Sequence, residues 1–350
     1  MSRILDQFSS KRSPRAFVGK SLPVQISFHN DHPNTLVFDD RNETPSCCVR
    51  CKDAPCVNLS PAETVISNFP DFPADRSESV CPSGALRLNG TNGAPIVDNR
   101  LCVFCGLCVI RCPVGAIRLD QKIGVVIQDE PGSRVRDASP EENITMPTLK
   151  KSGVLLRESD ALVEVLQIQL ANAGTQVGDR FPNVLARNLF LALGVGAATR
   201  RKGNNHMRMD LLLGPPGVQY GIAEVEFGFD AILNVPRDML DDVAVMVSRY
   251  GWDKQAMALA IIGDILPNKR SEYWRIIQDI RQVIKVEVGT ISILSLILLL
   301  WNHRTLALTP ANNPFYADSD TKSYRDQIME PALGRPLMLM QPSPLVEPSK

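Results

Sequence analysis

The chain has 350 residues, which predicts about two domains of ordinary size. Hydrophobic residues make up 44% of it and charged residues 22%, which suits a folded globular protein and excludes a fully disordered chain. Lysine plus arginine number 38, as do aspartate plus glutamate, so the net charge is zero and the chain is not a basic nucleic-acid-binding module as a whole.

The sequence shows no cleavable signal peptide and no segment long enough to span a membrane. The first residues lack the apolar core of a secretory signal, and the longest apolar run, Val288 to Trp301, is too short to span a bilayer. We therefore expect a cytoplasmic protein without membrane attachment. In a reducing compartment the nine cysteines, which all lie between Cys47 and Cys112, are more often metal ligands than disulfides.

The sequence divides into four segments by composition. The predicted segments are a cysteine-bearing domain with an N-terminal extension (1–128), a polar linker interrupted by prolines (129–152), a second domain (153–305) and a Pro-rich tail (306–350). We expect the tail to be extended or disordered, with Leu337 to Met340 as a docking point on its own domain.

The first domain contains a C-x2-C-x2-C-x3-C-P run formed by Cys102, Cys105, Cys108 and Cys112. Three thiolates at this spacing wrap a loop around one face of a [4Fe–4S] cubane, and the fourth is carried towards a second cluster. A zinc site needs only two close cysteine pairs, so it explains neither the third spacing nor the proline. The run therefore predicts iron–sulfur chemistry.

A partial repeat indicates two clusters. The stretch that begins at Cys81, CPSGALRL, parallels CPVGAIRL at Cys112, and Cys48, Cys51 and Cys56 lie upstream. Together these motifs resemble bacterial two-[4Fe–4S] ferredoxins, especially the iron–sulfur subunits of multi-subunit oxidoreductases. The chain departs from that family at Ser60, where a Cys-Pro is expected, and its Cys-Pro appears only at Cys81, after an apparent insertion.

The ferredoxin resemblance implies crossed ligation of two [4Fe–4S] clusters. One cluster would be held by Cys48, Cys51, Cys56 and Cys112, and the other by Cys81, Cys102, Cys105 and Cys108. Cys47 in place of Cys48 and an oxygen ligand from Ser60 remain alternatives. The clusters would either pass single electrons to a partner or act as a structural staple for a small core.

The second domain shows a regular order of predicted elements, which from its second expected helix onward is α-β-β-α-β-α-β. Its expected helices are 159–172, 182–193, 237–249 and 271–285, and its expected strands are 207–213, 218–229, 255–262 and 290–301. The last two strands flank a crossover helix, so we expect them to be parallel and buried on both faces.

Three carboxylates fall on two neighbouring predicted strands. Glu224 and Glu226 lie two residues apart, which places them on one sheet face, and a hairpin through Gly214 to Gly217 would bring Asp210 beside them. Convergent carboxylates of this kind suit Mg²⁺, which activates water for attack on a phosphodiester. The alternative is an ordinary solvated face of the sheet.

This pattern resembles the PD-(D/E)xK superfamily of nucleases, whose core is α-β-β-β-α-β. The resemblance implies a Mg²⁺-dependent DNA endonuclease, with a place in defence against phage or plasmids, and with Asp210, Glu224 and Glu226 as catalytic and metal-binding residues. The family's lysine is replaced by Glu226, and the residue before Asp210 is methionine where the family has proline. Dimers are common among such nucleases, so a homodimer stays open.

Basic residues precede the first strand of this domain. Arg200, Arg201 and Lys202 would contact DNA phosphates there, or would form a solvated loop. His206 and Arg208 would line the same cleft, and Glu164 on the first helix would approach the acids.

The sequence thus predicts a two-domain protein of mixed α+β and α/β class. Its main interpretation is a ferredoxin-like domain fused to a restriction-endonuclease-like domain that cuts DNA. The alternatives are an electron-transfer subunit, with protein subunits or a redox partner, and a catalytically dead nuclease fold that binds DNA.

Overall fold

We analysed a computed structural model of the chain. It describes residues 3–4, 26–27, 36–39, 54–60, 63, 72, 74–75, 77–88, 90, 95–98, 100–112, 117–120, 124–129, 134–137, 166, 170, 177–203, 207–214, 221–268, 270–302, 304–308, 313–316, 324 and 328–337. The chain forms two compact units. The first comprises residues 1–61 and 78–178, and the second comprises residues 62–77 and 179–350.

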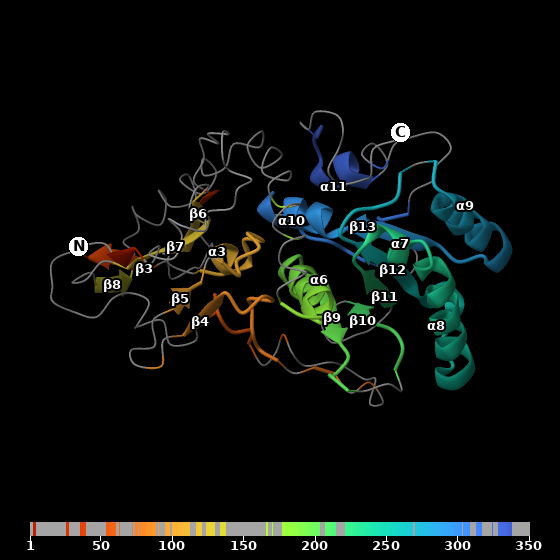
Figure 1. The fold of residues 1–350 in the computed structure, drawn as a ribbon, viewed down its shortest axis with the longest axis horizontal. Helices are drawn as coiled ribbons and strands as arrows, with labels where there is room; N and C mark the ends of the chain where they lie inside the picture. Colours follow the sequence, from red (N-terminus) through yellow and green to blue (C-terminus); the bar gives the residue numbers. More distant parts are fainter. Residues whose placement is uncertain are drawn as a thin grey trace. The chain divides into compact units, whose positions relative to one another are not determined.

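The first unit is built from short antiparallel strands around the cysteine region (Figure 1). A four-stranded sheet has the order β1-β7-β6-β2, and β3 pairs with β8 and β4 with β5. A single helical turn, α3 (Leu107–Ile110), follows the cysteine loop. The strands are β1 (Arg3–Ile4), β2 (Ile26–Ser27), β3 (Leu36–Asp39), β4 (Leu86–Leu88), β5 (Pro95–Val97), β6 (Ile117–Asp120), β7 (Gly124–Asp129) and β8 (Arg134–Asp137).

The second unit is centred on a five-stranded mixed sheet of order β13-β12-β11-β10-β9. The strands β9, β10 and β11 form an antiparallel meander, and β11, β12 and β13 run parallel. Every residue of β12 is buried, as expected for a central strand covered on both faces. The strands are β9 (Gly196–Thr199), β10 (Leu211–Gly214), β11 (Gly221–Glu226), β12 (Ala258–Gly263) and β13 (Val288–Ser292).

Helices cover this sheet, with α6 packed on β9 and β11, and α8 packed on β11 and β12 (Figure 1). The helix α10 packs against α6, and α9 packs against α8. The helices are α6 (Phe181–Ala192), α7 (Phe229–Ile232), α8 (Val235–Tyr250), η2 (Lys254–Ala256), α9 (Glu272–Asp279), η3 (Ile280–Ile284), α10 (Ile293–Trp301) and α11 (Glu330–Leu333). The mixed α+β character expected of the chain is therefore present.

The predicted final strand over residues 290–301 is wrong in its second half. The strand ends at Ser292, and residues 293–301 form helix α10, in which every side chain is buried. A helix that is apolar all round has the same composition as a buried strand, so periodicity does not separate the two. The missed signal is Ser292, whose hydroxyl accepts the N–H of Ser295 as a helix N-cap.

Strands also lie in two segments that the sequence analysis interpreted as connections. The strand β9 consists of glycine, alanine and threonine, which have small side chains and give a weak strand signal. The strand β8 lies within the predicted linker 129–152 and pairs with β3. The expected parallel pairing of the last two strands is confirmed between β12 and β13.

Distant segments of the chain cover both edges of the five-stranded sheet. At the β9 edge, Ala74 forms an antiparallel bridge with Arg200. At the β13 edge, the N–H of Thr290 donates to the carbonyl oxygen of Phe315 in the predicted tail, and Phe315 is fully buried. Leu337 is buried as well. An uncovered edge would expose unpaired backbone groups, so these segments complete the sheet.

Within the described ranges, no helix combines the length and the apolar character needed to cross a bilayer.

Replacement of Ser292 by alanine should destabilise the second unit by about 2 kcal/mol, because it removes a buried helix cap. The Ser292 hydroxyl also lies 2.7 Å from the Ser295 hydroxyl, which would lose this partner. Ser271→Ala is the matched control, since Ser271 caps α9 at a less buried site. Denaturant unfolding followed by tryptophan fluorescence should show a smaller shift for Ser271→Ala; equal shifts would contradict the importance of burial.

Candidate functional site

The cysteine loop has an unusual backbone. Phe104 and Gly106, on either side of Cys105, both have positive φ values, 61° and 79°. A positive φ is strained for a phenylalanine and is characteristic of sites where the backbone must curl tightly. The loop therefore wraps around the space that its cysteines enclose, and α3 begins directly after it.

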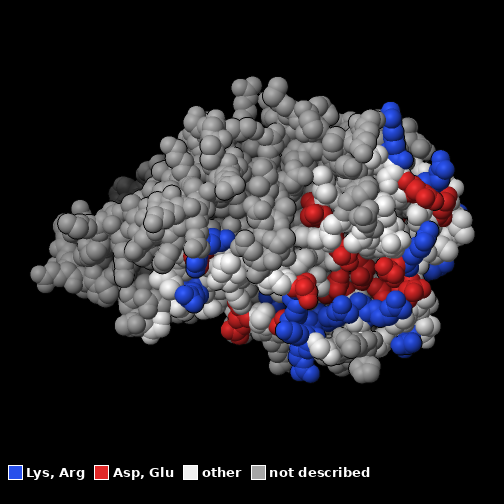
Figure 2. All heavy atoms as spheres, viewed as in Figure 1, with Lys and Arg blue, Asp and Glu red and all other residues white. Residues whose placement is uncertain are grey.

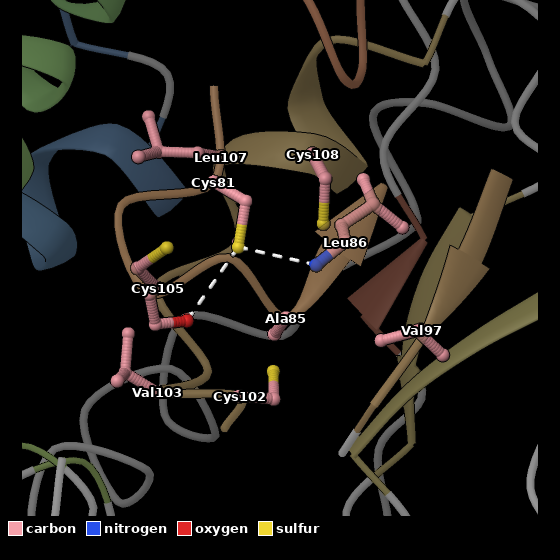
Figure 3. A pocket seen from close by; sticks show the side chains of 11 residues that line it. Cys81, Ala85, Leu86, Val97, Cys102, Val103, Cys105, Leu107 and Cys108 are labelled. Atoms are coloured by element: carbon pink, nitrogen blue, oxygen red, sulfur yellow. Dashed lines mark hydrogen bonds between the residues drawn. The ribbon is translucent and has the colours of Figure 1, made fainter. Parts of the chain in front are cut away.

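Four cysteine side chains share one cavity in the first unit. Figure 3 shows the sulfur atoms of Cys81, Cys102, Cys105 and Cys108 directed into it. The N–H of Leu86 lies 3.4 Å from the Cys81 sulfur and points to it. These are the four cysteines that the ferredoxin resemblance assigns to one cluster, and Cys81 comes from a segment well separated from the other three.

Electrostatics disfavour the ionised form of two of these thiols, those of Cys105 and Cys108. Burial raises the pKa of the Cys105 thiol, and the neighbouring Cys81 and Cys102 raise it further. Burial also raises the pKa of Cys108 well above its ordinary value, and the neighbouring Cys105 and Cys102 raise it further. Thiolates in this cavity require a positive partner, and the iron of a cluster is such a partner. The donor set therefore fits an iron–sulfur cluster.

The second predicted cluster is described only in part. The Arg111 guanidinium donates to the carbonyl oxygen of Pro55 at 2.8 Å, which ties the segment of Cys112 to that of Cys56. Both of these cysteines are buried. The other predicted ligands, Cys48 and Cys51, lie outside the described residues, as do Cys47, Glu164 and His206.

The predicted hairpin does bring Asp210 beside Glu224. The strands β10 and β11 pair antiparallel with Leu211 opposite Ala223, and the N–H of Asp210 donates to Glu224 Oε1 at 3.2 Å. Asp210 is 8% exposed, and its Oδ2 accepts the N–H of Val225 at 3.1 Å. Asp210 and Glu224 therefore lie together at the end of these strands.

Two residues that the sequence analysis did not single out complete this acidic cluster. Asn183 of α6 donates to Asp210 Oδ1 at 2.7 Å, and Asp242 of α8, 2% exposed, is hydrogen-bonded to Glu224. Asp242 lies on the buried, apolar face of the amphipathic helix α8. A carboxylate at such a position is unusual, and this is the sequence signal that could have identified the residue. The helices α6 and α8 thus both supply polar groups to the same point.

The acidic cluster is electrostatically strained. Burial raises the pKa of Glu224 well above its ordinary value, and Asp210 and Asp242 raise it further. Burial likewise raises the pKa of Asp210, although the hydrogen bond from the N–H of Val225 and the charge of Arg200 act to lower it. Burial and then the charge of Asp210 raise the pKa of Glu226. Perturbed carboxyl groups of this kind are more common at functional sites than elsewhere.

The carboxyl groups are engaged with protein partners. As the described side chains stand, no three Asp, Glu or His groups are arranged to hold a single metal ion. Arg200 Nη2 lies 3.4 Å from Asp210 Oδ1, and Glu224 is paired with Asp242. Among the described groups, the Arg200 guanidinium is therefore the cation that lies beside Asp210.

The predicted basic residues lie next to this cluster. Arg201 and Lys202 are exposed, and Arg208 forms an exposed ion pair with Asp241 at 3.5 Å. Figure 2 shows a band of lysine and arginine atoms directly beside a patch of aspartate and glutamate atoms. Arg200 differs from its neighbours because its guanidinium also donates to the Met207 carbonyl oxygen, at 3.0 Å.

Comparisons with known proteins identify a known type of domain in the first unit. A model of the 4Fe-4S binding domain matches residues 95–118, which include Cys102, Cys105, Cys108 and Cys112. An uncharacterized ferredoxin of Methanocaldococcus jannaschii is 32% identical over 79 residues, covering 23% of this chain and 37% of that protein. The chain therefore contains a ferredoxin-type 4Fe-4S domain.

Other relatives belong to oxidoreductases. The polyferredoxin-like subunit of an aliphatic sulfonate oxidoreductase from Pyrococcus furiosus is 31% identical over 83 residues, covering 24% of this chain and 36% of that subunit. The beta subunit of the NADH-dependent phenylglyoxylate dehydrogenase from Aromatoleum evansii is 28% identical over 197 residues, covering 52% of this chain and 39% of that subunit.

The chain spans less than two fifths of the length of each of these three relatives. No solved structure matches it. The comparisons give no support to a PD-(D/E)xK nuclease domain in the second unit.

Glu224→Gln should stabilise the protein at alkaline pH in metal-free buffer. The raised pKa of Glu224 means that the folded state binds a proton more tightly than the unfolded state, so stability is full below the ordinary pKa of 4.5 and falls as the pH rises towards the raised value. The glutamine carries no charge and still offers hydrogen bonds to Asp242 and Asp210.

Thermal unfolding at about pH 5 and about pH 8 tests this effect, with an expected gain of about 2–4 °C that appears only at the higher pH. Glu287→Gln, at an exposed glutamate of the same unit, is the control. A gain that is equal at both values of pH would show that Glu224 is not the group responsible.

Proposed function

We propose that the first unit holds two [4Fe–4S] clusters and passes single electrons between protein partners. What carries this proposal is the cavity into which the four sulfur atoms of Cys81, Cys102, Cys105 and Cys108 are directed. When bound, each cluster supplies a one-electron redox couple.

The protein around the cavity has clear roles in this proposal. Cys81, Cys102, Cys105 and Cys108 would hold one cluster, and Cys56 and Cys112 would hold the second with Cys48 and Cys51. Apolar side chains such as Leu86 and Val97 line the cavity and limit the access of water. Burial and N–H groups directed at the sulfur atoms are the features that set a cluster's potential.

The oxidoreductase relatives favour electron transfer over a purely structural cluster. The Pyrococcus and Aromatoleum relatives are, by name, subunits of oxidoreductases. We infer that this chain likewise works beside other protein subunits. The substrate of such an assembly would belong to those partners, since the described residues of this chain offer no further redox site.

Cys81→Ala should remove one cluster and lower the iron content of anaerobically purified protein from about eight to about four atoms per chain. Cys47→Ala is the matched control and should keep about eight. Iron analysis and electron paramagnetic resonance before and after reduction by dithionite provide the measurement. Clusters that are present but cannot be reduced and reoxidised would reject electron transfer and leave the structural staple.

A second candidate function is metal-dependent hydrolysis of phosphodiester bonds in DNA by the second unit. The specific observation that favours it is the order α6-β9-β10-β11-α8-β12, interrupted by the short helical segments α7 and η2, with Asp210 facing Glu224. Asp210, Glu224 and Glu226 would be the carboxylates that hold Mg²⁺, and Arg200, Arg201 and Lys202 would contact phosphates. The ion would supply Lewis acidity and an activated water.

Variants of Asp210 and Glu224 test this candidate function. Any Mg²⁺-dependent cleavage of DNA should fall about 100-fold or more in Asp210→Asn and in Glu224→Gln, because each variant removes one anionic oxygen, and should persist in Glu287→Gln. Gel assays on linear, supercoiled and single-stranded DNA provide the measurement. Salt-dependent binding without cleavage would instead support an inactive DNA-binding fold, and neither binding nor cleavage would reject the candidate.

A further inference from the structure

A short stretch of the chain between two cysteines belongs to the second unit. The chain leaves the first unit after Pro61 and returns to it at Glu78. We call the described residues at the end of this stretch the strap: Phe72, Ala74, Asp75 and Ser77. Cys56 precedes the strap and Cys81 follows it, and both cysteines belong to the first unit.

The strap extends the five-stranded sheet beyond β9. Ala74 forms an antiparallel bridge with Arg200, and the N–H of Asp75 donates to the carbonyl oxygen of Thr199 at 2.8 Å. Phe72 is buried. The strap is therefore docked by backbone pairing as well as by an apolar side chain.

Charged groups fix the strap in place. The Asp75 carboxylate lies 2.6 Å from Arg180 Nη1, and Arg180 also donates to the carbonyl oxygen of Arg200 at 2.6 Å. Burial acts to raise the pKa of Asp75, but the N–H of Ser77 and the charge of Arg180 outweigh it and lower the pKa. At neutral pH the strap is thus held by an ionised carboxylate.

A buried arginine takes two of its three described hydrogen-bond partners from the strap; the third is the Asn188 side chain, which accepts from Arg187 Nε at 2.9 Å. Arg187 of α6 is 2% exposed, and its Nη1 donates to the Asp75 carbonyl oxygen and the Ser77 hydroxyl, at 3.4 Å each. Its Nη2 has no hydrogen-bond partner within the described part of the chain. Release of the strap would leave more of this buried cation unpaired, which is unfavourable.

The strap also sets the position of Arg200. The main chain of Arg200 is held by Ala74 and Arg180, while its side chain reaches Asp210 Oδ1 at 3.4 Å. Movement of the strap therefore acts on a residue that faces the acidic cluster. This sequence of contacts lies entirely within the second unit.

We propose that iron–sulfur cluster occupancy controls the docking of the strap, and through it the placement of Arg200 against Asp210. This inference rests on the proposed cluster ligands Cys56 and Cys81, which flank the strap. Ligation fixes both ends of the segment and reduces the entropy that docking must overcome. Thermodynamic linkage is reciprocal, so a docked strap must in turn strengthen cluster retention.

Hydrogen–deuterium exchange of the full chain tests this coupling. The protein is compared with its clusters intact and after anaerobic removal of iron by a chelator. Exchange in peptides that cover Asp75, Thr199 and Arg200 should become about tenfold faster without clusters, while peptides from β12 and α10 should not change.

Variants test the reciprocal direction. Asp75→Asn should loosen the same peptides with the clusters intact, and the visible absorbance of the clusters should decay several-fold faster in the presence of the chelator. Asp98→Asn, at a carboxylate paired with Arg100 in the first unit, is the control and should change neither measurement. Ser77→Ala, which removes one partner of Arg187, is a milder variant in case Asp75→Asn does not fold.

Three outcomes would overturn the inference: an unchanged strap after cluster removal, a general loss of protection in β12 and α10, or a released strap with normal cluster retention. Iron analysis before the comparison separates this inference from the proposed function. If the purified protein never contains iron, the proposed clusters are refuted. If the protein contains iron but exchange in the strap is the same with and without clusters, only the coupling is refuted.

Discussion

The first unit depends on the desolvation of its cysteines. Cys102, Cys105 and Cys108 are buried and, with Cys81, line one cavity. Burial raises the pKa values of Cys105 and Cys108, and neighbouring cysteines raise them further, Cys81 and Cys102 at Cys105 and Cys105 and Cys102 at Cys108. Thiols in this state bind a cationic centre or stay protonated. The short strands and the single helical turn around them form a small core, to which ligation would add folding free energy.

In the second unit, buried charge is balanced by segments that are distant in sequence. Arg187 is compensated by the backbone and hydroxyl of the strap, and Asp210 is compensated by Arg200 and Asn183. The two edges of the sheet are completed in the same way, at β9 by the strap and at β13 by Phe315. A like-charged group such as Glu224 beside Asp242 weakens this unit, which is typical of a site retained for function.

The sequence predicted the features that depend on local spacing. The cysteine motif, the antiparallel hairpin that joins Asp210 to Glu224, and the parallel pairing of β12 with β13 all follow from patterns over a few residues. The identity of α10 did not follow, because an entirely buried helix has no polar face to mark its period. Asn183 and Asp242 were missed because their role arises only when α6 and α8 pack on the sheet.

The insertion between Cys56 and Cys81 also bears on how such a protein arises. A gene fusion that joins two complete domains end to end leaves each with a continuous stretch of sequence. Here residues 62–77 belong to the second unit although they lie, in sequence, between the two segments of the first unit. Recombination at a single point near residue 178 would therefore separate Arg187 from Asp75. The second unit therefore keeps its full set of contacts only when the segment between Cys56 and Cys81 stays on the same chain.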